Sequence, residues 1–183
     1  SGKWRDFAHI PGNWLGPAKT PVLHKSSGGL NTFFRWFLLQ NILKENLLDA
    51  YDQFILTRSD YYWVKPHPKL DLEHVWIPNG EFHGGLCDRH TVIPKQLVEK
   101  FLGVFSVLDS AKHLRPLEQF IASRPWASNW MLNNESYVFF MYALEGLLPH
   151  VAFFPQKMFT VTKPGAEGQN GMNLTHPKYP GVQ

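Results

Sequence analysis

The polar cluster Arg58-Ser59-Asp60 comes directly after a short apolar run, residues 53–57. The aromatic and β-branched residues of that run are typical of a buried strand, and open α/β sheets bind ligands at the carboxyl ends of their strands. A guanidinium can hold a phosphate through two hydrogen bonds, while a carboxylate suits a divalent cation that bridges phosphates. The cluster therefore indicates a phosphate site, although a surface ion pair between Arg58 and Asp60 would explain the same spacing.

Two more carboxylates stand where chemistry is expected. Asp88 follows a glycine-rich run, residues 80–85, whose glycines allow the backbone to approach a ligand closely. Glu135 lies at the start of an expected helix. A positioned carboxylate can deprotonate a hydroxyl group or stabilise an oxocarbenium-like centre. Without a ligand, Glu135 would complement the helix dipole and Asp88 would pair with Arg89.

The nine histidines invite a metal hypothesis that their spacing does not support. The sequence contains no HExxH or CxxC motif, and His83, Cys87 and His90 form only a loose cluster. Structural roles are therefore favoured over zinc binding for these three residues.

Composition indicates one folded domain over residues 1–183, or one module of a longer chain, because 44% of the residues are hydrophobic. A net charge of +3 without a dense Lys/Arg run argues against nucleic-acid binding. The single cysteine excludes an internal disulfide framework and favours a reducing compartment such as the cytoplasm. No apolar run is long enough for a transmembrane helix. Fourteen Phe and seven Trp favour a sugar or nucleotide ligand, with Trp63, Trp76 and Phe82 as candidate stacking surfaces.

The elements that must position these residues alternate between helices and strands, which predicts an α/β domain in three layers. Helices are expected over residues 32–45, 94–102, 115–123 and 135–148, strands over 53–57, 75–77, 151–154 and 158–161, and a loop or tail over 162–183. Asn31 and Asn134 are the expected helix caps. One face of the first helix is expected to be apolar apart from Asn41, and it consists of Leu30, Phe33, Phe34, Phe37, Leu38, Asn41 and Ile42. Arg35, near the first turn of that helix, is expected to face solvent unless it serves an anion.

Four stretches carry a family resemblance. They are SGKWR at the start, YDQFILTRSDYYW over residues 51–63, GGLCDR over 84–89 and NNESY over 133–137. In this order they resemble GT-A-fold glycosyltransferases, most closely the group typified by the N-terminal domain of a chlorovirus capsid-glycosylating enzyme. The resemblance implies a three-layer α/β/α domain with a mixed central sheet.

The resemblance also implies a function, namely transfer of a sugar from a nucleoside-diphosphate donor, a UDP- or GDP-sugar, to a glycan or glycoprotein acceptor. The residues implied to bind the nucleotide sugar are Gly2, Arg5, Arg58, Ser59 and Asp60. Asp60 would meet the diphosphate directly or through Mn²⁺ or Mg²⁺. Asp88 and Glu135 would be the catalytic residues at the acceptor and the transferred sugar. The metal motif of the family is ideally Asp-x-Asp, and here Tyr62 replaces its second carboxylate. His176 is the candidate for a late metal ligand.

Two other classes remain open at this stage. A non-catalytic carbohydrate-binding module would use the exposed aromatic residues and would need neither Asp60 nor a nucleotide. A hydrolase would use two carboxylates of the same set.

Overall fold

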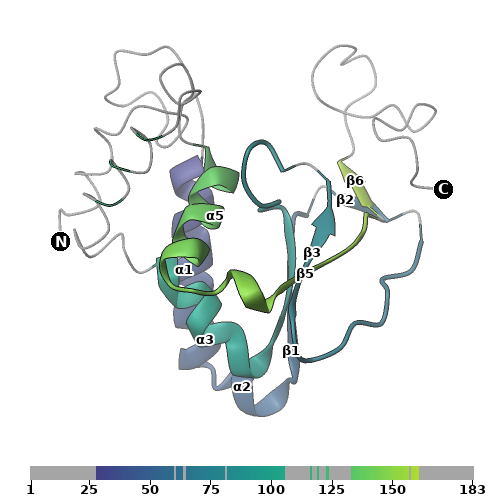
Figure 1. The fold of residues 1–183 in the computed structure, drawn as a ribbon. Helices are drawn as coiled ribbons and strands as arrows, with labels where there is room; N and C mark the ends of the chain where they lie inside the picture. Colours follow the sequence, from purple (N-terminus) through teal and green to yellow (C-terminus); the bar gives the residue numbers. More distant parts are fainter. Residues whose placement is uncertain are drawn as a thin grey trace.

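The computed structural model describes residues 28–59, 61–63, 65–80, 82–105, 133–156 and 158–160, together with the single positions 116, 119 and 123 (Figure 1). The helices are α1 (Gly28–Lys44), α2 (Leu47–Ala50), α3 (Lys95–Gly103), α5 (Asn134–Leu144) and the short 3₁₀ helix η5 (Leu148–His150). The strands are β1 (Gln53–Thr57), β2 (Tyr61–Trp63), β3 (Val75–Asn79), β4 (His90–Pro94), β5 (Val151–Pro155) and β6 (Met158–Thr160).

The main sheet has four strands in the order β1-β4-β3-β5. Strand β4 pairs antiparallel with β1 and with β3, whereas β3 and β5 run parallel. Strands β2 and β6 form a separate antiparallel pair. The expected α/β class with a mixed sheet is therefore confirmed.

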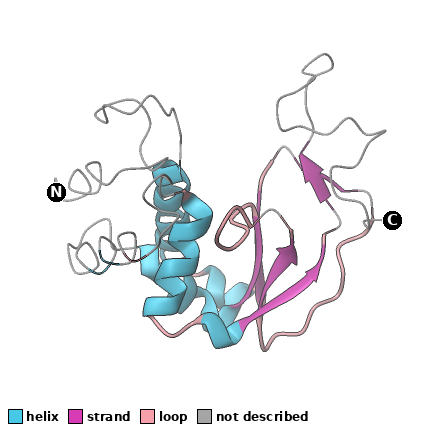
Figure 2. Ribbon diagram, turned by 45° about the horizontal axis from the view of Figure 1, so that its top comes forward, coloured by secondary structure: helices cyan, strands magenta, loops and turns pink. Residues whose placement is uncertain are grey.

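Helices α1, α3 and α5 stand together on one face of the main sheet, and the β2–β6 pair lies away from them (Figures 1 and 2). The described residues thus form two layers, and no third, helical layer is found among them. Among these same residues, no helix has the length and apolar character that crossing a bilayer requires.

The core lies between the helices and the sheet. Helix α3 contributes Val98, Phe101 and Leu102 at helical spacing, and all three side chains are fully buried. Helix α5 is buried nearly all round, with eight of its eleven residues buried. The apolar area buried between the helices and the sheet is the main source of hydrophobic stabilisation in the described fold.

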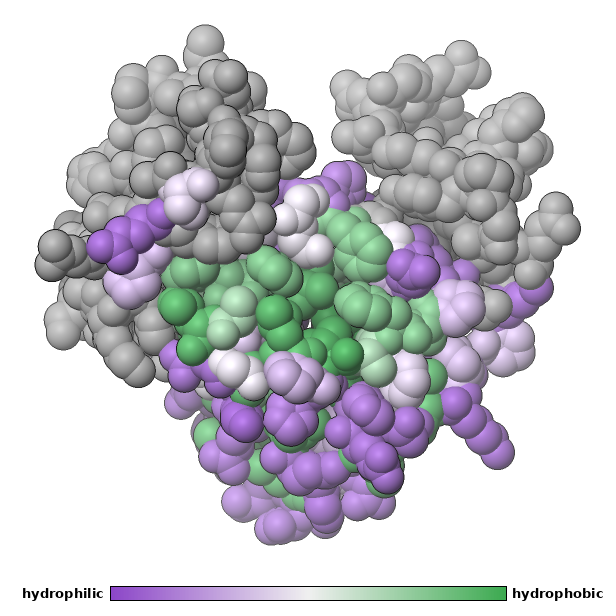
Figure 3. Space-filling view, viewed as in Figure 1, coloured by the Kyte–Doolittle hydropathy of each residue, from purple (hydrophilic) through white to green (hydrophobic). Residues whose placement is uncertain are grey.

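The face of α1 that packs inward differs from the one expected. Thr32, Arg35, Leu39 and Ile42 are buried, whereas Phe34 is 59% exposed. Phe33, Phe37 and Leu38 are exposed as well. The expected face was therefore right at Ile42 and wrong at the four exposed residues, because α1 is apolar almost all round and apolar spacing alone does not select one side. Figure 3 shows apolar side chains gathered across the middle of the face seen in Figure 1, with polar side chains below them.

Several element boundaries were predicted well. Strand β1 has the expected bounds, β5 extends the expected 151–154 by one residue, and Pro94 directly precedes α3. The predicted burial of β1 was wrong, because β1 is an edge strand of the main sheet and its Ile55 is half exposed. Of the expected helix 115–123, only Pro116, Gln119 and Ser123 are described.

Two cap predictions were wrong. Helix α1 begins at Gly28, so Asn31 lies inside it. Helix α5 is capped by Asn133 and not by Asn134. The side chain of Asn133 accepts from Ser136 N at 2.7 Å, and Ser136 Oγ accepts from Asn133 N at 3.3 Å, which completes a capping box. The helix ends at Leu144 rather than at residue 148.

Strand β4 was not expected, because His90 was assigned to a loop that continues from the glycine-rich run. Its sequence HTVIP is nevertheless rich in β-branched residues, and all five side chains are buried. This strand is the centre of the sheet arrangement that positions the site, since it pairs with both β1 and β3.

Candidate functional site

A cleft of about 620 Å³ opens between α1, the carboxyl end of β1 and the segment that precedes β4. Its polar lining includes Arg35, Arg58, Ser59, Asp88 and Arg89. Its apolar lining includes Phe34, Leu38 and Ile55. The structure therefore brings together three of the predicted site residues, Arg58, Ser59 and Asp88, at the end of the strand where a ligand was expected.

Strand pairing explains why residues so distant in sequence meet here. Thr57 at the end of β1 lies opposite His90 at the start of β4. Directly beyond this pair, Arg58 N donates to the carbonyl oxygen of Arg89 at 3.2 Å. The antiparallel register thus fixes the backbone of Arg58 beside the segment that carries Asp88 and Arg89.

The burial of Arg35, which lines the cleft, differs from what the sequence predicted. Its side chain is only 6% exposed, so the expected solvated arginine near the first turn was wrong. Its Nη2 donates to the carbonyl oxygen of Asp88 and, at 3.4 Å, to Thr91 Oγ1, and its guanidinium lies 5.5 Å from the ring centre of Phe105. Nη1 is buried and finds no hydrogen-bond partner among the described residues.

The charge of this cleft favours an anion. Three arginines line it, and Asp88 is the carboxylate in its described lining. A buried positive charge such as that of Arg35 is poorly screened by water, so it acts strongly on a ligand nearby. The arrangement suits a phosphate or diphosphate better than a neutral sugar alone.

Asp88 is held through both its backbone and its side chain. Its carbonyl oxygen accepts from Arg35, and its Oδ2 accepts from Asn134 Nδ2. Asn134 Oδ1 in turn accepts from Thr32 Oγ1 at 2.6 Å. Two of the sequence motifs, residues 84–89 and 133–137, are therefore in direct contact.

The same two motifs pack backbone against backbone, in a region that we call the loop–helix junction (residues 82–88 against 133–136). Leu86 N donates to the carbonyl oxygen of Glu135 at 3.0 Å, and Asn133 Nδ2 donates to the carbonyl oxygen of His83 at 2.7 Å. A Cβ atom on Gly85 would overlap the Glu135 carbonyl group. Gly85 thus allows close approach to a helix, and the expectation that it faces a ligand was wrong.

Glu135 is not brought to the cleft. Its side chain is 9% exposed, and it is absent from the described lining. The structure therefore separates the two predicted catalytic carboxylates, because only Asp88 reaches the cleft.

Four of the predicted site residues lie outside the described residues. They are Gly2, Arg5, Asp60 and His176. The predicted metal ligand Asp60 directly follows Ser59, which does line the cleft. Among the described residues, no group of three or more His, Cys, Asp or Glu side chains could hold a metal ion.

The expected stacking surfaces serve packing instead. Trp63 lies against His67 and His90, with ring centres 5.3 Å and 5.2 Å apart, and Phe82 lies 5.6 Å from Phe153. Neither ring lines the cleft that the described residues form.

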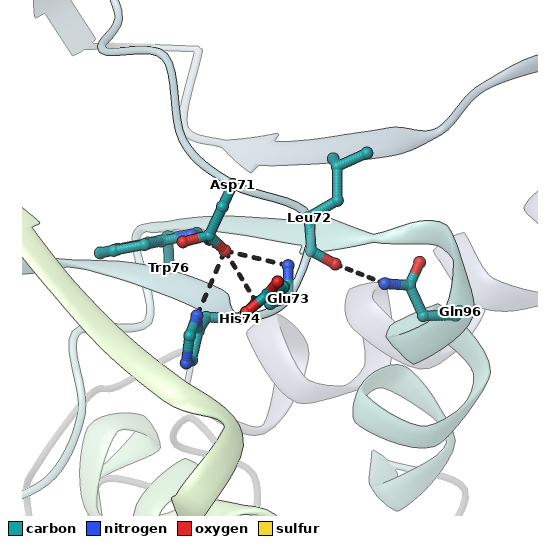
Figure 4. Close-up of polar contacts among 6 residues, drawn as sticks. All are labelled: Asp71, Leu72, Glu73, His74, Trp76 and Gln96. Carbon is teal, nitrogen blue, oxygen red and sulfur yellow. Dashed lines mark hydrogen bonds and ion pairs between the residues drawn. The ribbon is translucent and has the colours of Figure 1, made fainter.

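Trp76 is likewise occupied, by a surface turn centred on Asp71 (Figure 4). The Asp71 carboxylate accepts from Glu73 N at 2.9 Å, from His74 N at 3.2 Å and from Trp76 Nε1 at 3.4 Å. These hydrogen bonds, that of Glu73 first, lower the pKa of Asp71. The group orders the chain that enters β3, and its hydrogen bond to Nε1 fixes the Trp76 ring outside the described lining of the cleft.

At the start of β4, next to Arg89 of the cleft, His90 forms a pair with His67. His90 Nε2 lies 3.3 Å from His67 Nε2, and His67 Nδ1 lies 2.8 Å from the carbonyl oxygen of Pro68. Since that carbonyl requires a proton on His67 Nδ1, His90 is the donor between the rings. Burial, then the charges of His67 and Arg35, lower the pKa of His90 to about 3. His90 is therefore neutral near pH 7.

Four further residues matter here. Thr32 was not singled out from the sequence, whereas Arg35, Arg89 and Asn134 were expected in other roles, as a solvated or anion-binding arginine, a partner of Asp88 and a helix cap. Arg89 had a signal, because it directly follows Asp88 in a motif already singled out. The contacts that Thr32, Arg35 and Asn134 make had no signal in the sequence, since they span 46 to 102 residues of chain. In comparisons with known proteins, no family model, curated protein or solved structure matches this chain.

Proposed function

We propose that this protein is a nucleotide-sugar-dependent glycosyltransferase, and that the cleft between α1 and β1 binds the diphosphate of the donor. One observation carries the proposal: three arginines and Asp88 converge on a single cleft at the end of the strand that bears Arg58-Ser59. The resemblance of four ordered motifs supports it. A GT-A arrangement with a third layer is part of the same proposal.

In this proposal Arg58 and Arg89 bind the phosphate oxygens, and the buried Arg35 adds positive charge behind them. Departure of a nucleoside diphosphate leaves negative charge on the phosphates, and fixed cations stabilise that charge in the transition state. Asp60 would add a Mn²⁺ or Mg²⁺ ion on the same phosphates. Gly2 and Arg5 would hold the nucleotide.

Asp88 takes the role of the carboxylate at the reacting sugar or its acceptor. It lines the cleft with the arginines, so a donor bound through its diphosphate would have its sugar near this side chain. Deprotonation of an acceptor hydroxyl is work that a positioned carboxylate performs. The exposed ring of Phe34 provides a flat apolar surface for the nucleobase.

The lining also weighs against the carbohydrate-binding module. A carbohydrate-binding module would present stacked aromatic rings without a cationic cluster. Trp63, Trp76 and Phe82 lie outside the described lining, whereas three arginines lie in it.

A ligand panel tests the proposal. UDP, GDP and free oligosaccharides are added to the protein with and without Mn²⁺, and thermal stability is followed, since a ligand of the folded state raises the melting temperature. We expect stabilisation by UDP or GDP, enhanced by Mn²⁺, and little effect of free sugars. Stabilisation by oligosaccharide with no response to either nucleotide would identify a binding module instead.

Arg58→Ala then locates the site. Hydrogen bonds to charged groups contribute about 1.5–3 kcal/mol, so nucleotide affinity should fall roughly 10- to 100-fold in calorimetry. Lys44→Ala is the matched control, because Lys44 is an exposed cation at the other end of α1, paired with Glu45 at 3.2 Å. Equal losses of nucleotide affinity in the two variants would mean that binding depends on the overall charge of the protein and not on the cleft.

A further inference from the structure

The side chain of Asn134 is buried at the start of α5 without serving as its cap. Asn133 provides the complete capping box, so the helix start does not need Asn134. Yet Asn134 is only 3% exposed, and a buried amide is costly unless all its hydrogen bonds are made. Its contacts therefore require another explanation.

Those contacts form a directed chain from α1 to the cleft. Asn134 Nδ2 donates to Asp88 Oδ2, and Asn134 Oδ1 accepts from Thr32 Oγ1 at 2.6 Å. Thr32 is fully buried. The three residues come from α5, the segment before β4 and α1, and the last two of these elements line the cleft.

The chemistry of the three groups allows one arrangement. An ionised carboxylate only accepts hydrogen bonds, so the amide must turn its NH₂ group toward Asp88. Its carbonyl oxygen then faces Thr32, whose hydroxyl must donate. Turning the amide around would place two acceptors together at Asp88, which is unfavourable in a buried site.

As a result, hydrogen bonds from α5 and α1 fix the orientation of the Asp88 carboxylate. Oδ2 of Asp88 is held by Asn134, and its backbone carbonyl is held by Arg35 from α1. Oδ1 lies outside this network and belongs to a residue that lines the cleft. A base that must meet one acceptor hydroxyl works best when its rotamer is locked by such supporting bonds.

We propose that Asn134 and Thr32 are positioning residues that orient the Asp88 carboxylate toward the sugar acceptor. This inference rests on the proposed glycosyltransferase function. Neither residue touches the substrate; Thr32 acts through Asn134, and Asn134 acts through Asp88.

The test compares Thr32→Val with Thr32→Ser. Valine keeps the shape but removes the hydroxyl, whereas serine keeps the donor to Asn134. Nucleoside diphosphate release from a panel of UDP- and GDP-sugars is measured with the wild type, and the donor it cleaves is then used for the variants. We expect kcat to fall about tenfold or more in Thr32→Val, with KM for the donor nearly unchanged, and to be largely restored in Thr32→Ser.

A double-mutant cycle shows whether the effect passes through Asp88. In an Asp88→Asn background, Thr32→Val should cause no further loss, because the group that it positions is already gone. Asn134→Leu provides a second variant with an expected loss of roughly 10²-fold in kcat. Melting temperatures are recorded for every variant, and the Val/Ser pair decides if Asn134→Leu does not fold.

The outcomes separate the two proposals. If the wild type cleaves a donor but Thr32→Val and Thr32→Ser have the same kcat, or if Thr32→Val acts equally in the Asp88→Asn background, the positioning role is overturned and the glycosyltransferase function stands. If the wild type neither binds a nucleoside diphosphate nor cleaves any donor, the proposed function fails, and the positioning role fails with it.

Discussion

The cleft and the loop–helix junction share Asp88 but are built in opposite ways. The cleft is open, and its arginines and exposed apolar side chains face a volume of about 620 Å³. The junction is closed, with the backbone of Gly85 against that of Glu135 and no room for even one added carbon atom. Changes in the junction should therefore alter stability, whereas changes in the cleft should alter ligand binding.

The largest effect is expected for Gly85→Ala. The added Cβ would overlap the Glu135 carbonyl group and Ser136 N, and backbone cannot move aside as a flexible side chain can. Overpacking of this kind costs about 1–3 kcal/mol or more in the free energy of unfolding. Urea denaturation measures the loss.

Gly103→Ala is the matched control for that change. Gly103 ends α3, and an added Cβ there meets only Leu39 Cδ2, at 4.0 Å. We expect it to leave stability unchanged or to raise it by up to about 1 kcal/mol through helix propensity. Equal losses for Gly85→Ala and Gly103→Ala would show that the junction is not closed in the way the structure indicates.

The difference between the two regions also explains what the sequence could reveal. The bounds of β1 and the cluster at its end follow from local apolar runs and polar breaks, so the place of the cleft was predictable. The buried face of α1 was not, because its apolar residues surround the helix while Thr32 and Arg35 face inward. Hydrogen bonds to Asn134 and Asp88, residues distant in sequence, hold that face.

The glycine-rich run 80–85 also shows that residue type predicts local backbone properties but not long-range contacts. Residue type indicated that the 80–85 run allows a close approach, and this was correct for Gly85. The identity of the approaching partner, a helix backbone instead of a ligand, depends on tertiary packing. The separation of Glu135 from the cleft follows from the same contact, since it is the backbone of Glu135 that receives the loop.

The second effect in size concerns pH and tests the buried His90 at the start of β4, outside the junction. The pKa of His90 is lowered to about 3, whereas a histidine in the unfolded chain has a pKa of about 6.5. Between these two pKa values the unfolded chain binds a proton that the folded protein does not. The contribution of His90 to the free energy of unfolding is therefore fully present above pH 6.5 and is lost as the pH decreases. The expected loss between pH 7 and pH 5 is about 2 kcal/mol in the free energy of unfolding.

His90→Gln isolates this contribution. The variant cannot bind the proton, so its stability should change less than that of the wild type over the same pH range in urea denaturation. A matched control is His83→Gln, because His83 is exposed in the loop that leads to the junction. Parallel pH dependence of the wild type and His90→Gln would contradict the assigned burial of a neutral His90.

The smallest effect is expected at Asn133, which separates side-chain from backbone contributions in the junction. Its Oδ1 caps α5, and its Nδ2 donates to the carbonyl oxygen of His83. Asn133→Ala removes both bonds and should cost about 1–2 kcal/mol. Asn133→Asp keeps the capping oxygen and places a negative charge at the helix start, losing only the donor to His83, so its cost should be about 1 kcal/mol or less.

Nucleotide binding should be unaffected in both, because Asn133 lies outside the described lining of the cleft. A variant that melts like the wild type but no longer responds to UDP or GDP would place Asn133 in the ligand site and would remove the distinction between the two regions.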